Sequence, residues 1–103
     1  MTDAINQRYG ITDEAIEAEV RRLLPAMQEW GEQDARTYLF TPLSDADVVR
    51  QRLANVQAKA NNALEGIYPT AEDEARFEIE MRLRWDVEKA IRYVNHTFSS
   101  TRC

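Results

Sequence analysis

The sequence predicts an all-α fold: a three-helix bundle-like domain with a first helix over about 13–30 and a long αα-hairpin over about 45–66 and 71–97. Apolar residues recur at intervals of three and four along these segments, and each segment begins with a helix-capping pattern. The longest alternating stretch, whose pattern is also typical of a strand, is rich in good helix formers. The 103 residues are expected to form one domain, with a flexible arm at 1–10 and a flexible tail at 99–103.

The first helix is expected to begin after Thr12, whose hydroxyl can cap the free amides of the first turn. Pro25 lies roughly opposite the apolar face, so we expect a kink that bends the helix around the core. Gly31 predicts the end of this helix. The apolar face consists of Ile16, Val20, Leu23, Met27 and Trp30.

The second helix has the clearest start signal, because Ser44 and Asp47 form a pattern like a capping box. Gly66 and Pro69 mark its end. The short connection to the next segment predicts two antiparallel helices side by side. The apolar stripe resembles the a/d seam of a coiled coil, although it is too short for a free coiled coil, and consists of Val49, Leu53, Val56, Ala60, Leu64 and Ile67.

The stretch 76–87 decides the fold class, because apolar and charged residues alternate along it. Strict alternation is typical of a strand, and a strand here would give an α+β fold instead. The composition favours a helix, as does the i,i+4 spacing of Glu78 and Arg82 and a capping pattern that starts at Thr70. We therefore predict one helix over 71–97.

That helix has apolar side chains on two sides, which is typical of a helix enclosed by its neighbours or shared with a second molecule. Aromatic residues and arginine are enriched at binding hot spots. The sequence therefore predicts a homodimer and a protein partner, both bound through the second and third helices. The predicted partner-binding residues are Phe77, Met81, Arg82, Arg84 and Trp85.

Charge and composition argue against several other classes of partner. The formal net charge is −5, and the cations of 82–92 are interleaved with acids, so nucleic acid is an unfavourable partner. No apolar run approaches bilayer length, and the N-terminus lacks the apolar core of a signal peptide, so we expect no membrane association. Cys103, the only cysteine, allows no intrachain disulfide, and we expect a cytoplasmic protein.

No residue pattern predicts a catalytic, cofactor or metal site, since His96 is the only histidine and no glycine-rich phosphate loop occurs. We predict a small acidic, non-enzymatic interaction module: an adaptor, an inhibitor or a regulatory subunit. A nucleic-acid-binding module is disfavoured by the charge. The alternative is a helical metal-dependent hydrolase that binds Mg²⁺ through clustered carboxylates, for which the candidates are Glu14, Glu17, Glu72, Asp73, Glu74, Glu78 and Glu80.

Overall fold

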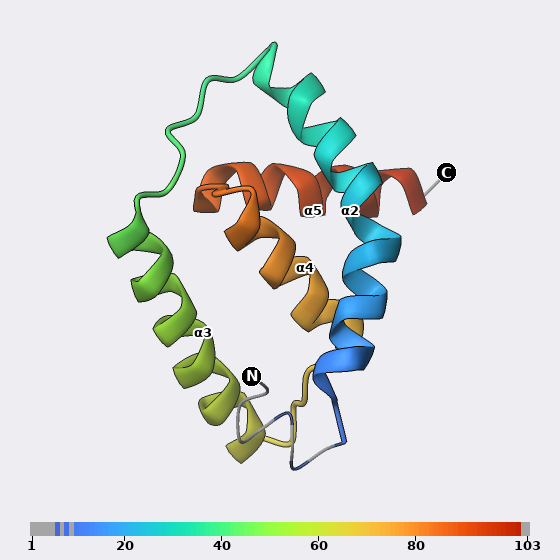
Figure 1. Cartoon of the computed structure of the whole chain (residues 1–103), viewed down its shortest axis with the longest axis vertical. Coiled ribbons are helices and arrows are strands. Elements are labelled where there is room, and N and C mark those ends of the chain that lie inside the picture. Colours follow the sequence, from blue (N-terminus) through green and yellow to red (C-terminus); the bar gives the residue numbers. More distant parts are fainter. Residues whose placement is uncertain (1–5, 7, 9, 102–103) are drawn as a thin grey trace.

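The computed structural model describes residues 6, 8 and 10–101, with side chains through Thr97, and this part of the chain confirms the all-α prediction. The described residues contain no strand, so the α+β alternative is wrong. Much of the predicted arm, and the last two residues of the predicted tail, lie outside the described residues. The helices, in the order of Figure 1, are α2 (Asp13–Ala35), α3 (Asp45–Leu64), α4 (Ala71–Arg82) and α5 (Val87–Thr101).

The first three of these helices begin where the capping patterns predicted. The Thr12 hydroxyl accepts a hydrogen bond from the Ala15 amide at 3.1 Å. Ser44 and Thr70 each form a reciprocal capping box with the aspartate three residues later. Such caps satisfy amides that the first helical turn leaves without partners, so the local sequence alone determines these starts.

The predicted end of the first helix at residue 30 is wrong, because α2 continues through Gly31 to Ala35. Gly31 is helical and buried, and it allows a close approach to another part of the chain. A Cβ atom at this position would lie 2.8 Å from Cζ2 of Trp85. The glycine therefore makes room for an indole ring and does not end the helix.

We expect Gly31→Ala to lower the free energy of unfolding by about 1–3 kcal/mol, because the added methyl group overpacks against the buried indole. Alanine inside a helix normally gives about 1 kcal/mol more stability than glycine. The expected loss of stability is therefore opposite to the change that helix propensity alone predicts. Urea denaturation followed by circular dichroism measures the effect. Ala18→Gly, at an exposed position of α2, is the control for propensity alone, and a stabilised Gly31→Ala would contradict the packing of Trp85.

The predicted single helix over 71–97 is also wrong, because the chain turns between α4 and α5. Arg84 has a φ of 57°, a conformation that glycine usually adopts at this position. The Trp85 amide donates to the Glu80 carbonyl at 2.9 Å and the Arg84 amide donates to the Met81 carbonyl at 3.2 Å, which is the Schellman pattern of a helix end. The Asp86 carboxylate then accepts from the Lys89 amide at 2.8 Å and caps α5.

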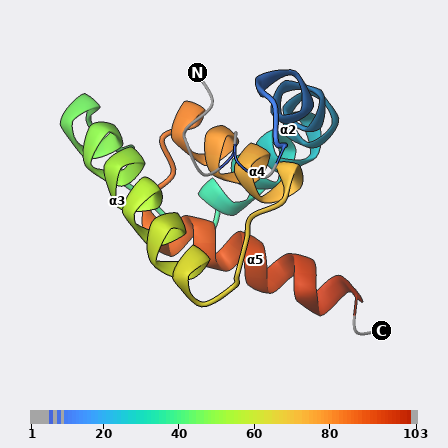
Figure 2. The ribbon, with the colours of Figure 1, turned by 90° about the horizontal axis from the view of Figure 1, so that it is seen from below.

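The core lies where α4 packs against α2 and α5 crosses behind them (Figures 1 and 2). Its buried members are Val20, Met27, Ala75, Ile79 and Trp85, and no described residue of α3 belongs to this cluster or to the apolar side chains packed on it. The expected αα-hairpin is therefore not closely packed, since α2 is the main partner of α4. The radius of gyration is 14.2 Å. A compact domain of this length has about 13 Å.

α5 is fixed to the end of α2 by a buried lysine. Lys89 is 1% exposed, and its Nζ donates to the Gly31 carbonyl at 2.8 Å and lies 3.8 Å above the centre of the Phe40 ring. Arg92 forms two hydrogen bonds, of 3.0 and 2.9 Å, with the Asp34 carboxylate, and these bonds hold the pKa of Asp34 below its usual value. These contacts join α5 to α2, which also packs on α4, and α3 lies beside these three helices.

Candidate protein-binding surface

An apolar groove of about 360 Å³ runs between α4 and α5. Its lining comes from α4, from the turn that follows it and from α5, whose side chains form an exposed wall, with Gln51 of α3 also contributing. The exposed fractions of Val87, Ile91 and Val94 on that wall are 55%, 53% and 37%. The lining residues are Gln51, Phe77, Glu80, Met81, Trp85, Asp86, Val87, Ala90, Ile91 and Val94.

The groove brings together three of the five predicted partner-binding residues. Phe77 is half-buried, whereas Met81 and Trp85 are 5% and 4% exposed. The Trp85 ring packs against Trp30 and Tyr93, with ring centres 5.5 and 5.6 Å away. Met81 and Trp85 therefore shape the groove from below, and their role in binding a partner stays a prediction.

The two predicted arginines lie away from the groove lining and are engaged within the chain. The Arg82 guanidinium contacts Glu17, and its Nε donates to Glu78 at 3.2 Å. The Arg84 guanidinium donates to the Leu43 carbonyl at 2.9 Å and to the Asp45 carboxylate at 2.6 Å. Both side chains thus link distant parts of the chain, and whether they also contact a partner stays a prediction.

Glu80 is the group in the groove whose chemistry the sequence pattern did not reveal. Burial raises the pKa of its carboxyl to about 7, and the charge of Arg76 offsets this rise only in part. No hydrogen bond or ion pair to the Glu80 carboxyl occurs among the described side chains. The groove therefore combines an apolar lining with a half-buried acid that titrates near neutral pH.

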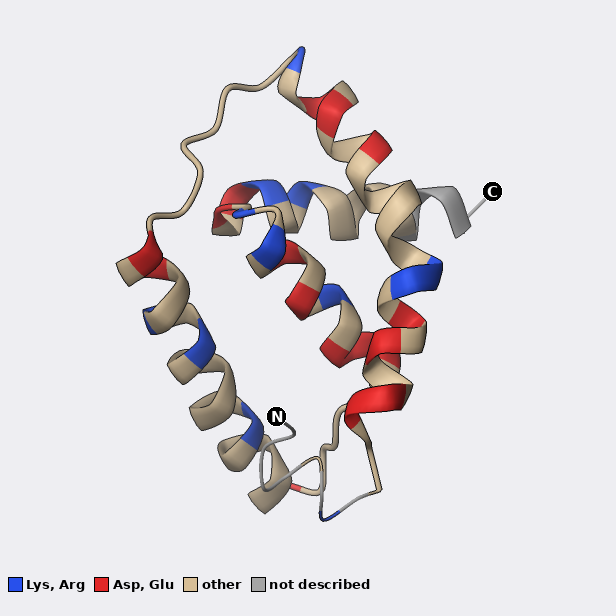
Figure 3. Cartoon of the chain, viewed as in Figure 1, with Lys and Arg blue, Asp and Glu red and all other residues tan. Residues whose placement is uncertain are grey.

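A second hollow, of about 470 Å³, lies between α4, α3 and the start of α2 and is lined by charged and apolar side chains alike. After its first turn α3 carries cations and no acids, whereas α4 is rich in acids (Figure 3). Arg52 of α3 forms a two-pronged ion pair with Glu78 of α4, with hydrogen bonds of 2.7 and 3.2 Å. Opposite charges thus join α3 to α4, whereas no described residue of α3 belongs to the buried apolar core.

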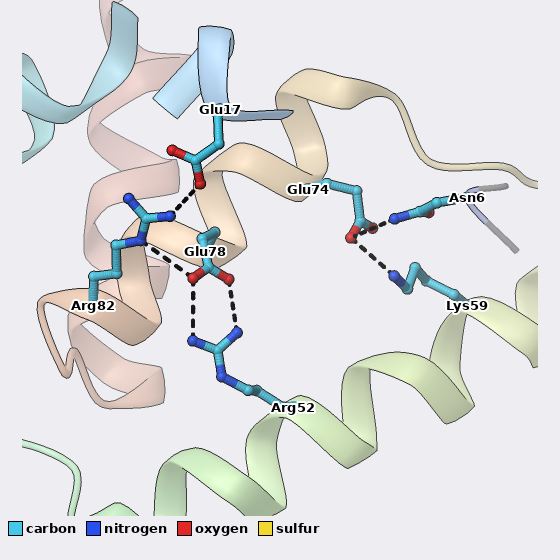
Figure 4. A network of polar contacts seen from close by, with 7 residues as sticks. All are labelled: Asn6, Glu17, Arg52, Lys59, Glu74, Glu78 and Arg82. Carbon is cyan, nitrogen blue, oxygen red and sulfur yellow. Dashed lines mark hydrogen bonds and ion pairs between the residues drawn. The ribbon is translucent and has the colours of Figure 1, made fainter. Parts of the chain in front are cut away.

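The most buried of these contacts joins Lys59 to Glu74 (Figure 4). The Lys59 Nζ lies 2.8 Å from the Glu74 carboxylate, and these side chains are 7% and 11% exposed. The Asn6 side chain donates to the same carboxylate oxygen at 3.3 Å. An ion pair this deep is costly to break, because the remaining charge has little access to water.

Most of the apolar stripe of α3 faces solvent, and its member Val56 also lines the hollow toward α4. Gln51 and Asn55 are half-buried and Lys59 is buried, so the inward face of α3 is largely polar. The predicted stripe lies about a quarter of a turn away from that face, since successive helical residues are rotated by about 100°. The exposed fractions along it are 66% for Val49, 58% for Leu53, 42% for Val56, 88% for Leu64 and 55% for Ile67.

The carboxylates proposed as metal ligands are arranged differently from a metal centre. Glu74 and Glu78 face Lys59 and Arg52, so protein cations already neutralise them. No group of three His, Cys, Asp or Glu residues suited to a metal ion occurs within the described part of the chain. No helix among the described residues is long and apolar enough to cross a bilayer.

No protein-family model, curated protein or solved structure matches this chain.

Proposed function

We propose that this protein is a small, acidic, non-enzymatic interaction module that binds a helix of a partner protein in the groove between α4 and α5 and that also associates with itself. The observation that carries the proposal is the distribution of apolar residues. Two helices expose apolar faces to solvent, while the core is confined to α2, α4, α5 and their connections. Exposed apolar surface of this kind marks interaction sites in soluble domains. An adaptor, an inhibitor and a regulatory subunit would all use such a surface, in the cytoplasm as the sequence predicts.

The shape and charge of the groove favour an amphipathic helix that carries a basic residue. Grooves between two helices accept a helix through apolar residues spaced three and four apart. The Val87, Ile91 and Val94 side chains would contact such a stripe. Glu80 would face the cation, and ionisation of its half-buried carboxyl would then be compensated by an opposite charge.

A displayed library of single helices, panned against the protein at pH 8, tests this proposal. We expect the selected helices to share one apolar stripe and a Lys or Arg beside it. Ile91→Asp should weaken their binding at least tenfold, because it places a charge on the exposed wall of the groove. Binding should also weaken as the pH falls below the pKa of Glu80, which is about 7, since the protonated carboxyl no longer attracts a cation.

Leu53→Asp, on the exposed stripe of α3, is the matched control and should leave helix binding unchanged. Ile91 and Leu53 are substituted instead of Trp85, because Trp85 is buried in the core and its removal would unfold the protein rather than test binding. Failure to select any helix, or selection of helices that bind Ile91→Asp equally well, would show that the groove is not the binding site.

A further inference from the structure

The seam of α3 consists of Val49, Leu53, Val56, Ala60 and Ala63, and the chain covers it only along one edge, where Val56 lines the hollow toward α4 and Ala63 is half-buried. Val49, Leu53 and Val56 are 66%, 58% and 42% exposed. The spacing of 49, 53, 56, 60 and 63 alternates between four and three residues, which is the heptad pattern of two paired helices. A face with this pattern is completed by another helix.

The sizes of the seam residues indicate which helix pairs with this face. Along positions 49, 53, 56, 60 and 63 the first three side chains are the larger ones and the last two are Ala60 and Ala63, with Leu64 of the wider stripe beside them. In an antiparallel pair of identical helices, Val56 lies opposite Ala60 of the second copy and Leu53 lies opposite Ala63. Every such layer then combines a large and a small side chain. A parallel pair would instead place alanine against alanine and leave the second half of the seam underpacked.

The charges beside the seam permit this approach. Arg52 and Lys59 lie along one edge of the stripe, and Glu78 and Glu74 of the same chain neutralise them at 2.7 and 2.8 Å. Arg50 lies on the other edge and is paired with Asp47. Two copies can therefore bring their α3 helices together without placing unneutralised cations against each other.

We propose that α3 pairs with α3 of a second copy as an antiparallel two-helix seam with Leu53 opposite Ala63. This proposal rests on the self-association included in the proposed function and specifies its geometry. Burying the exposed parts of the seam in both copies would remove on the order of 1,000 Å² from water, near the lower limit for a specific interface. The dimer is therefore expected to be reversible and concentration-dependent.

Disulfide cross-linking in a Cys103→Ser background tests the register. Leu53→Cys and Ala63→Cys are prepared separately, with a size tag on one of them, and are oxidised alone and as a mixture. In the antiparallel seam the two copies of position 53 are about 15 Å apart along the helix axis, as are the two copies of position 63. A disulfide needs Cα atoms within about 7 Å. We therefore expect the mixed dimer, and little cross-linking of either variant alone.

Efficient cross-linking of Leu53→Cys with itself would overturn the antiparallel register in favour of a parallel one. Absence of all three cross-links, or a monomer by light scattering at high protein concentration, would overturn the seam. Leu53→Asp should abolish the dimer while keeping its helical circular dichroism, because this side chain is exposed in the single chain. Ile91→Asp should leave cross-linking unchanged, so failure of the groove and failure of the seam are separate results.

Discussion

We expect Lys59→Met to lower the free energy of unfolding by about 3–5 kcal/mol, because it leaves a buried carboxylate without its cation. The Lys59 and Glu74 side chains are 7% and 11% exposed, so water cannot take over the role of the ammonium group. Methionine keeps much of the length of the lysine side chain, and the loss therefore reports the charge more than the volume. Urea denaturation at pH 7, at a protein concentration low enough to keep the chain monomeric, measures the effect.

Arg52→Met is the matched control, because Arg52 lies on the same face of α3 two helical turns earlier. Its ion pair with Glu78 is more accessible to solvent, with side chains 44% and 25% exposed. Such a pair contributes up to about 1 kcal/mol, so the control should be far milder. Lys59→Met combined with Glu74→Leu should recover most of the lost stability, since it removes both charges. Equal losses in the two single variants, or no recovery in the double variant, would contradict this account of how α3 is held.

Hydrogen exchange gives a second measurement of the same prediction. α3 contributes nothing to the apolar core among the described residues, so it should open more easily than α2 or α4. In Lys59→Met, the amides of α3 should lose protection first, while those around Ile79 keep theirs. Uniform loss of protection along the chain would mean that α3 folds and unfolds together with the core.

The predictions that depend on neighbouring residues in the sequence were the most successful. Thr12, Ser44 and Thr70 each cap a helix because their partners lie only three residues away, and a single sequence contains all of that information. The all-α class follows from the same local signals. The ion pair between Glu78 and Arg82 was likewise expected from its i,i+4 spacing and is present.

The turn between α4 and α5 was missed because it lacks the glycine that usually marks the end of a helix. An arginine occupies the left-handed position that usually identifies a helix end by its glycine. The guanidinium of Arg84 reaches Leu43 and Asp45, and these distant contacts help to offset the cost of the left-handed backbone. Asp86, which caps α5, was the local signal that could have located the break. Without the break, Trp85 was assigned to a helix surface, whereas the turn directs it into the core beside Gly31.

Three of the residues that line the groove, Phe77, Met81 and Trp85, were among those named from the sequence, but their arrangement was not predicted. The seam of α3 was visible in the spacing of its apolar residues, and α3 was expected to lie antiparallel beside the third helix. Its exposure depends instead on Arg52 and Lys59, which hold the polar side of α3 toward α4 through acids far away in the sequence. Pairings between distant charges of this kind cannot be read from periodicity.

We expect Glu80→Gln to stabilise the protein at pH 8 by as much as about 3 kcal/mol and to have little effect near pH 5. Burial raises the pKa of Glu80 from 4.5 to about 7, so the folded state retains a proton that the unfolded chain releases. Stability therefore falls as the pH rises from about 4.5 to about 7, and above this range the fold bears the full cost of a buried negative charge. Glutamine has nearly the same shape and no charge, so the variant should lose this dependence on pH.

Glu78→Gln, two residues away on the same helix, should have the opposite effect. Burial tends to raise the pKa of Glu78, but hydrogen bonds and charges from Arg52 and Arg82 outweigh it and lower the pKa. The ionised form of Glu78 thus stabilises the fold above its unfolded pKa, and this stabilisation is lost as the pH falls. Removing the charge should therefore destabilise the protein at pH 8. Urea denaturation of the wild type and both variants at pH 5 and pH 8 decides between the two behaviours. If Glu80→Gln were destabilising at pH 8, the carboxylate of Glu80 would have a cationic partner in the folded chain, and the groove would lack the free acid that a basic helix is expected to meet.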